Sequence, residues 1–200
     1  MGHPAFFADA PRITLYDPLA EFLGAAEGGL IDYGYIDAVK LAGHSCPTVA
    51  GAYMMTLRAL RHLYGAAIPE RGAVRVAFRE SLLEGVTGVM AGVAKLLTGA
   101  TQDDGFKGLA GRFDRRRLLD FDADGDGEMM FSRTDTGASV AATFNGHIVS
   151  PDAGMRNLMQ RVLVGMASPE EQREFGRLWQ DRVRRILVDH ADDPRLVTLI

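Results

Sequence analysis

The sequence contains a single cysteine in 200 residues, which excludes an intramolecular disulfide and every zinc module built from several cysteines. No run of about 18 apolar residues is present, so we expect no membrane-spanning helix. Residues 1–16 lack a basic segment followed by an apolar one, so we expect no secretory signal. Together, these absences predict a protein of the reducing cytoplasm.

The chain also lacks an excess of basic residues. It carries 22 lysines and arginines against 26 aspartates and glutamates, for a net charge of -4. Because nucleic-acid-binding domains are normally basic, neither a nucleic acid nor a membrane surface is expected as a partner. One short basic run, residues 115–117, is surrounded by aspartates, and we interpret it as a solvated strand entry rather than a phosphate-binding patch.

The hydrophobic fraction of 47% is normal for a globular protein. Apolar periodicity and capping residues predict a short helix after Asp17, strands over 30–41 and 74–78, helices over 47–64 and 82–98, a meander of strands over 117–121, 128–134 and 139–144, and helices over 152–167 and 168–189. This order predicts an α+β fold with a central, mostly antiparallel sheet and packed helices. We divide it into a core domain over 1–150 and a helical C-terminal extension over 151–200.

The single cysteine lies in residues 43–47, GHSCP, directly before the helix expected over 47–64. Proline is favoured at the first helical position, so Pro47 makes Cys46 the N-cap residue. The positive end of a helix favours the thiolate, which is the form that attacks electrophiles and binds metals. The strand expected over 30–41 would place this motif at a strand-to-helix junction.

His44 lies two residues before this cysteine. It would serve either as a base for the thiol or as a second ligand of a metal ion that the thiolate binds. Imidazole nitrogen and thiolate sulfur suit zinc, nickel or iron. Two ligands do not complete a site. A third ligand must therefore come from elsewhere in the chain, from a partner subunit, or from water or substrate.

Three glycines, Gly85, Gly88 and Gly92, fall inside the helix expected over 82–98. Each costs roughly 1 kcal/mol of helix propensity relative to alanine. Their spacing produces a flat stripe, which serves either close helix packing or a ligand held against the backbone.

Residues 43–47, followed by Gly51, resemble the Gly-His-x-Cys-Pro-Gly segment of the FmdE-like family, which takes its name from a component of formylmethanofuran dehydrogenase. Residues 96–101, LLTGAT, and the glycine-containing loop with Lys107 resemble a second block of that family, Leu-Thr-Gly-Cys-Thr and the loop after it. The resemblance implies an α+β core, a homodimer and a transition metal, most simply zinc, near the His-x-Cys segment.

The sequence also departs from the family pattern. Ala42 stands where the family commonly has a histidine, and Ala100 replaces the cysteine of the second block. No cysteines remain for the C-terminal zinc finger of some members. The chain is therefore expected to be a divergent member without that finger.

The resemblance and the residue chemistry together assign candidate roles. His44 and Cys46 are the predicted metal ligands, and Cys46 and Glu80 are the catalytic candidates. Glu80 would orient His44 or accept a proton, while Thr101 and Lys107 would bind substrate, with the lysine holding an anionic group.

The function predicted from these roles is that of a metal-binding protein with a redox or accessory task in a metalloenzyme pathway. One alternative is a metal-free enzyme in which Cys46 is the nucleophile, activated by the helix end and by His44. Another is a binding module in which Cys46 is an inert part of the core.

Overall fold

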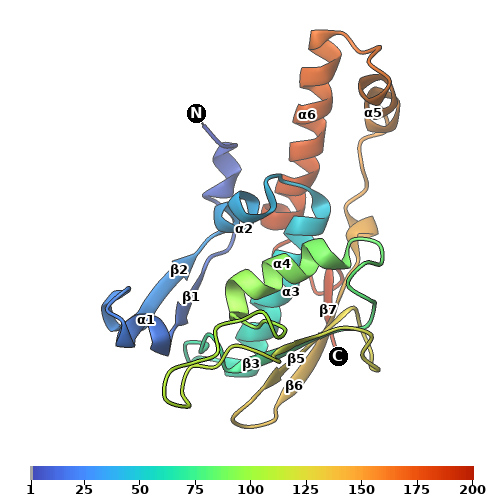
Figure 1. Ribbon diagram of the computed structural model, residues 1–200. Coiled ribbons are helices and arrows are strands. Elements are labelled where there is room, and N and C mark those ends of the chain that lie inside the picture. Colours follow the sequence, from blue (N-terminus) through green and yellow to red (C-terminus); the bar gives the residue numbers. More distant parts are fainter. Residues whose placement is uncertain (1) are drawn as a thin grey trace.

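Two β-sheets and the helices around them make up residues 2–200, the part of the chain that the computed structural model describes (Figure 1). The strands are β1 (Ile13–Tyr16), β2 (Leu30–Tyr33), β3 (Val74–Phe78), β4 (Leu119–Asp120), β5 (Met129–Arg133), β6 (Ser139–Phe144) and β7 (Val197–Leu199). The α-helices are α1 (Pro18–Phe22), α2 (Tyr35–Ala42), α3 (Pro47–Tyr64), α4 (Thr87–Thr98), α5 (Met155–Leu163) and α6 (Pro169–Arg184). Short 3-10 turns cover Ala5–Phe7, Glu27–Gly29 and Gly146–Ile148, and a π-helical turn covers Arg185–Asp189.

The larger sheet has the strand order β4-β3-β5-β6-β7. Every neighbouring pair is antiparallel except β3 and β4, which run parallel. The hairpin of β5 and β6 agrees with the prediction, and Met129 lies opposite Ala142 in its register. The α+β class and the mostly antiparallel sheet are therefore confirmed.

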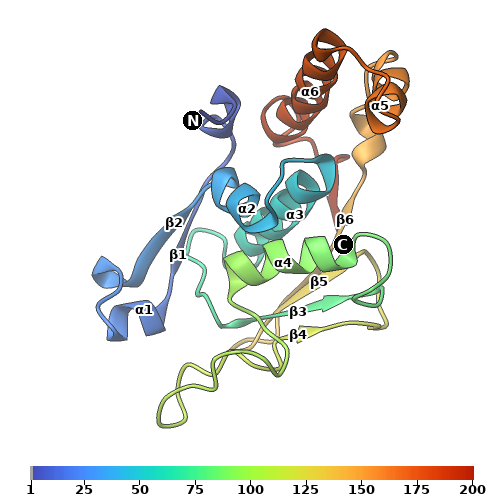
Figure 2. The same cartoon turned by 45° about the horizontal axis from the view of Figure 1, so that its top comes forward.

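Helix α3 forms the centre of the core. It contacts β5, β6 and β7 of the sheet, while α4 and α2 pack against it and against each other (Figures 1 and 2). Tyr53, Met54 and Leu57 are almost fully buried. At Gly51 the helix approaches β6 so closely that a Cβ atom would lie 2.5 Å from Cδ1 of the Phe144 ring. The glycine is thus required by the packing of α3 on the sheet.

The strand predicted over 30–41 is wrong beyond its first residues. The strand β2 ends at Tyr33, and α2 follows directly. The side chain of Asp37 accepts a hydrogen bond of 2.9 Å from the amide of Gly34, which caps the start of α2. Tyr35, Ala38 and Val39 are buried at helical spacing, so their burial favours the helix over an alternating strand.

The helix predicted over 152–167 contracts to α5, and two further elements are also shorter than expected. The helix predicted from residue 82 begins at Thr87, because Gly85 adopts a left-handed conformation with φ of 52°. The strand predicted over 117–121 contracts to β4, since Arg117 and Asp122 on either side of it also have positive φ values. This strand pairs in parallel with β3 and is not part of a hairpin meander.

The C-terminal helices α5 and α6 project from the body, and α6 leads back to it through the π-helical turn (Figures 1 and 2). The predicted capping box is present, because Ser168 Oγ accepts from the amide of Glu171 and Glu171 accepts from the amide of Ser168. Strand β7, which was not predicted, adds to the sheet beside β6. The division into 1–150 and 151–200 stays a prediction.

No helix within residues 2–200 combines the length and the apolar character that crossing a membrane requires.

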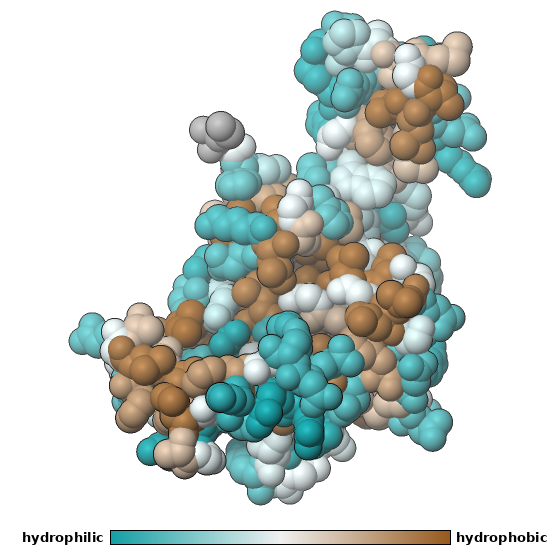
Figure 3. Space-filling view, viewed as in Figure 1, coloured by the Kyte–Doolittle hydropathy of each residue, from teal (hydrophilic) through white to brown (hydrophobic). Residues whose placement is uncertain are grey.

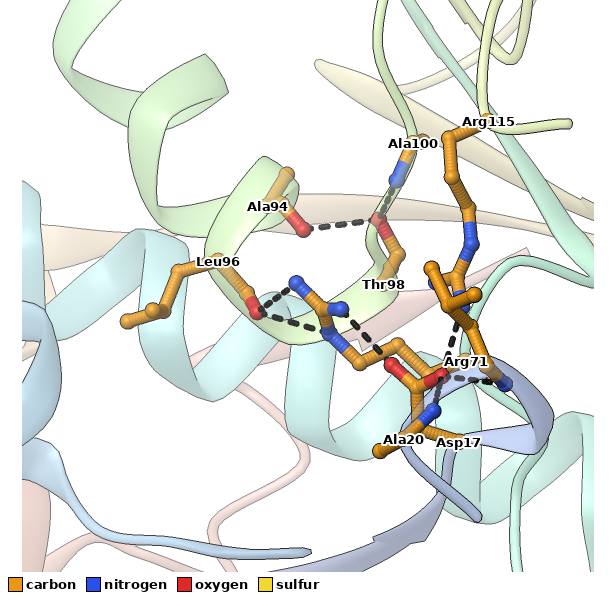
Figure 4. Close-up of polar contacts among 9 residues, drawn as sticks. Asp17, Ala20, Arg71, Ala94, Leu96, Thr98, Ala100 and Arg115 are labelled. Atoms are coloured by element: carbon orange, nitrogen blue, oxygen red, sulfur yellow. Dashed lines mark hydrogen bonds and ion pairs between the residues drawn. The ribbon is translucent and has the colours of Figure 1, made fainter. Parts of the chain in front are cut away.

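A buried carboxylate, Asp17, connects three separate parts of the chain (Figure 4). As predicted, it caps α1, accepting from the amides of Leu19 at 3.0 Å and Ala20 at 3.1 Å. It also accepts from Arg71 Nη1 at 2.9 Å and from Arg115 Nη2 at 2.7 Å. The side chains of Asp17 and Arg115 are only 5% and 6% exposed, so the interpretation of Arg115 as part of a solvated run is wrong.

The charges of this cluster keep Asp17 ionised. Burial by itself raises the pKa of Asp17, but the hydrogen bonds from Arg71 and the amide of Ala20 and the charge of Arg115 outweigh it. The pKa of Asp17 is therefore lowered from its ordinary value.

Replacing Asp17 by asparagine leaves a buried arginine without its counter-ion, which should lower the free energy of unfolding by about 3 kcal/mol. Urea denaturation of the full chain measures this change. The matched control is Asp32→Asn, which breaks the exposed pair with Arg12 and should cost at most about 1 kcal/mol. Equal losses in the two variants would contradict a special role for the buried carboxylate.

The lowered pKa also predicts a pH dependence. The folded state binds fewer protons at Asp17 than the unfolded chain, so its contribution is complete above the unfolded pKa of about 3.9 and is lost as the pH falls through the folded value. The difference in unfolding free energy between the wild type and Asp17→Asn should shrink as the pH is lowered below about 4. A difference that stays constant with pH would refute this linkage.

Candidate functional site

The predicted motif lies in the short loop between α2 and α3. Helix α2 ends at Gly43, whose φ of 75° gives the left-handed C-cap. Cys46 is the N-cap of α3, as predicted, and its Sγ accepts a hydrogen bond of 3.4 Å from the amide of Val49. The motif therefore sits at a helix-to-helix junction, and the strand-to-helix junction expected from the sequence is corrected.

The loop is held by the C-terminal part of the chain. The carbonyl of Ser45 accepts from Trp179 Nε1 at 3.0 Å and from Gln180 Nε2 at 3.1 Å. The Ser45 hydroxyl donates to Gln180 Oε1 at 2.9 Å, and Tyr35 from α2 lies 3.0 Å from the same hydroxyl. These contacts fix the backbone between His44 and Cys46 from both sides.

Tyr35 takes part in this arrangement as a hydrogen-bond donor. Burial raises the pKa of its phenol above the ordinary value, and the contact with Ser45 reverses this only in part. Since the hydroxyl of Ser45 already donates to Gln180, the protonated Tyr35 donates to Ser45. A series of hydrogen bonds thus runs from Tyr35 in α2 through Ser45 in the loop to Gln180 in α6.

Sequence reasoning missed Ser45, Tyr35, Trp179 and Gln180. Trp179 is the single tryptophan of the chain, and this rarity is the one feature of the sequence that could have pointed to it. In the sequence it fits only the apolar face of α6, because nothing there relates it to a loop 134 residues away.

The ring of His44 is exposed, and its Nδ1 lies 3.0 Å from the carbonyl oxygen of Ala42. A carbonyl oxygen can only accept, so in the neutral ring Nδ1 carries the proton and Nε2 keeps its lone pair. A backbone partner of this kind orients the histidine ligands of many metal sites. Cys46 is a partly buried free thiol.

A cavity of about 260 Å³ lies beside His44, between α2 and the first half of α4. Its lining is mostly apolar and consists of Leu41, Ala42, His44, Gly88, Val89, Gly92 and Val93. Two glycines of the predicted stripe, Gly88 and Gly92, thus help to form a cavity, while Gly85 lies before the helix. Beyond Gly92 the nearest atom that a Cβ would meet is Cδ2 of Leu41, at 3.8 Å.

The remaining candidates lie outside this lining. Glu80 is exposed, and its Oε2 accepts from Thr87 Oγ1 at 3.1 Å near the start of α4. Thr101 follows the other end of that helix, where its hydroxyl donates to the carbonyl of Arg115 at 2.6 Å. Lys107 is exposed in the loop that follows. Glu80 therefore contacts the residue before Gly88 of the lining, and the structure brings none of these three candidates into the lining of the cavity.

Within residues 2–200, no three side chains of histidine, cysteine, aspartate or glutamate come together as a metal-binding group. His44 and Cys46 therefore offer two donor atoms on one fixed loop, and a complete coordination shell needs further ligands.

Comparison with known proteins shows which family the chain belongs to. The family described as "FmdE, Molybdenum formylmethanofuran dehydrogenase operon" matches residues 41–193, which include both the motif and the α6 residues that hold it. A comparison with curated proteins gives no significant match. Since the matched segment is more than half of the sequence, the chain belongs to the FmdE family.

Proposed function

We propose that this protein binds a transition metal ion, zinc in the first place, through Nε2 of His44 and Sγ of Cys46. The observation that carries the proposal is the hydrogen bonding of Trp179 and Gln180 to Ser45. It holds the residue between the two donors in one backbone conformation. Such fixed positioning lowers the cost of ordering the ligands when the ion binds.

The donor set agrees with zinc, because imidazole and thiolate are its common protein ligands. Nickel and iron accept the same donors. With two protein ligands, positions remain for water, for substrate or for a partner subunit, and an ion bound in this way polarises a substrate oxygen as a Lewis acid.

The biological task that we propose is an accessory or redox role in a metalloenzyme pathway. Its support is membership of a family described by a molybdenum formylmethanofuran dehydrogenase operon. The cavity beside His44 would hold a small, mostly apolar group next to the bound ion.

The second candidate is a thiol enzyme without a metal. Cys46 is free, is partly accessible and lies at the N-terminus of an 18-residue helix, which is a position where reactive cysteines are found. In this case His44 would serve as the base, and the cavity would receive the electrophilic substrate.

We further propose that the chain forms a homodimer through the surface around the His44 cavity. Leu41 and Val89 of the lining are exposed, and so are Leu82, Leu83 and Val86 in the segment before α4. Figure 3 shows apolar side chains gathered over α2 and α4. An exposed apolar surface of this kind is typical of an interface, and a second chain there could complete the metal coordination.

The metal proposal predicts about one zinc ion per chain in protein purified without an affinity tag and without added metal. His44→Ala and Cys46→Ser should each lose most of this metal, because two donors on one loop act together. Elemental analysis by mass spectrometry gives the stoichiometry. His62→Ala changes an exposed histidine of α3 and should keep the metal.

Absence of metal in the wild type would contradict this proposal. Alkylation then separates the remaining functions. Rapid modification of Cys46 at about pH 6 that slows in His44→Ala would favour the thiol enzyme, whereas slow modification in both would favour a binding module.

The dimer proposal predicts a dimer by sedimentation velocity. Leu83 is 93% exposed, so Leu83→Asp should not disturb the folded chain but should dissociate the dimer by burying a charge in its interface. Leu163→Asp, at an exposed residue of α5, is the control and should leave the dimer intact. A monomeric wild type, or dissociation by the control alone, would contradict the proposed interface.

A further inference from the structure

A second cavity of about 320 Å³ lies between α1, the turn before β3 and the loop after α4, and shares no lining residue with the cavity at His44. It is lined by Pro18, Glu70, Arg71, Gly72, Arg112, Phe113, Asp114 and Arg115. A water molecule occupies only about 30 Å³, so the cavity has room for a small organic molecule.

The charges around this cavity do not cancel. Arg71 and Arg115 share the single carboxylate of Asp17, which leaves one positive charge between them. Asp114 is neutralised by Arg116, whose Nε and Nη2 donate to it at 3.0 and 2.8 Å.

The remaining lining charges are those of Glu70 and Arg112, both exposed. Within residues 2–200, Arg112 forms no salt bridge, and its guanidinium lies 4.7 Å from the centre of the Phe113 ring. One positive charge therefore remains in excess around the cavity, and the guanidinium of Arg112 can donate hydrogen bonds to a ligand.

Arg115 has an unpaired donor although its side chain is only 6% exposed. Its Nη2 donates to Asp17, but Nη1 is buried and has no hydrogen-bond partner among the described residues. A buried donor without an acceptor is costly, and native structures rarely contain one. A water molecule or a ligand would supply the acceptor that this guanidinium lacks among the described residues.

Two glycines make room for the Arg115 side chain. A Cβ atom at Gly72 would lie 2.6 Å from its Nε, and a Cβ at Gly99 would collide with Nη1. The guanidinium therefore occupies space that other residues would fill, and Asp17 fixes its orientation. Such a preorganised arginine, with an unused N–H group, suits a planar or tetrahedral oxyanion.

We propose that this cavity binds the oxyanion group of a small molecule, a phosphate or a carboxylate. Arg115 and Arg112 hold the group, and the rest of the cavity accommodates the remainder of the ligand. This site is independent of the metal site, because its residues and its chemistry are different.

The test titrates inorganic phosphate, and separately acetate, into the full chain at constant chloride concentration, with detection by the amide NMR signals of Gly72 and Phe113. We expect a saturable shift with at least one anion, and the tighter of the two identifies the class of oxyanion. Arg112→Ala, which changes an exposed side chain, should weaken the binding by about tenfold or more.

The control is Arg117→Ala, which removes the same charge from the same loop but at a residue outside the cavity, paired with Asp103. It should bind the anion as the wild type does. No saturable shift with either anion, or equal weakening in the two variants, would overturn the proposal, because Arg115 would then be satisfied by water or the effect would be one of net charge.

Discussion

The arrangement of this molecule depends on the hydrogen bonds and ion pairs that the buried carboxylate of Asp17 makes. It caps α1 and accepts hydrogen bonds from Arg71, before β3, and from Arg115, in the loop after α4. Arg71 in turn donates to the carbonyl of Leu96 in the last turn of α4, at 3.2 Å from both Nε and Nη2. Because a buried charge cannot lose its partner without a large cost, these segments are held in one relative position.

Helix α4 contacts residues of both candidate sites. Its 12 residues span about 18 Å. The first half lines the cavity at His44, and the carbonyl at its far end accepts from Arg71. One cavity is mostly apolar and has a histidine in its lining, whereas the other is lined by arginines, so the two candidate sites differ in their chemistry.

Several elements follow from local chemistry, and these could be predicted. Cys46, Pro47 and Gly65 define both ends of α3 through capping alone, and Asp17 likewise begins α1. The helix α2 could not be distinguished from a strand, because apolar residues at short spacing fit both patterns until burial selects one face. The burial of Arg115 could not be predicted for a related reason, since its neighbours in sequence are solvated but its partner Asp17 is 98 residues away.

The sequence by itself determined the family, the α+β class and the place of Cys46 as the N-cap of α3. Motifs and caps depend on neighbours a few residues apart, and these are visible in a linear chain. Only the tertiary structure decided that Trp179 and Gln180 hold the loop between His44 and Cys46, and that Arg115 lies buried with an unused donor. Both features arise from contacts between distant segments, whose pairing is set by the packing of the whole core and by the need to satisfy buried polar groups.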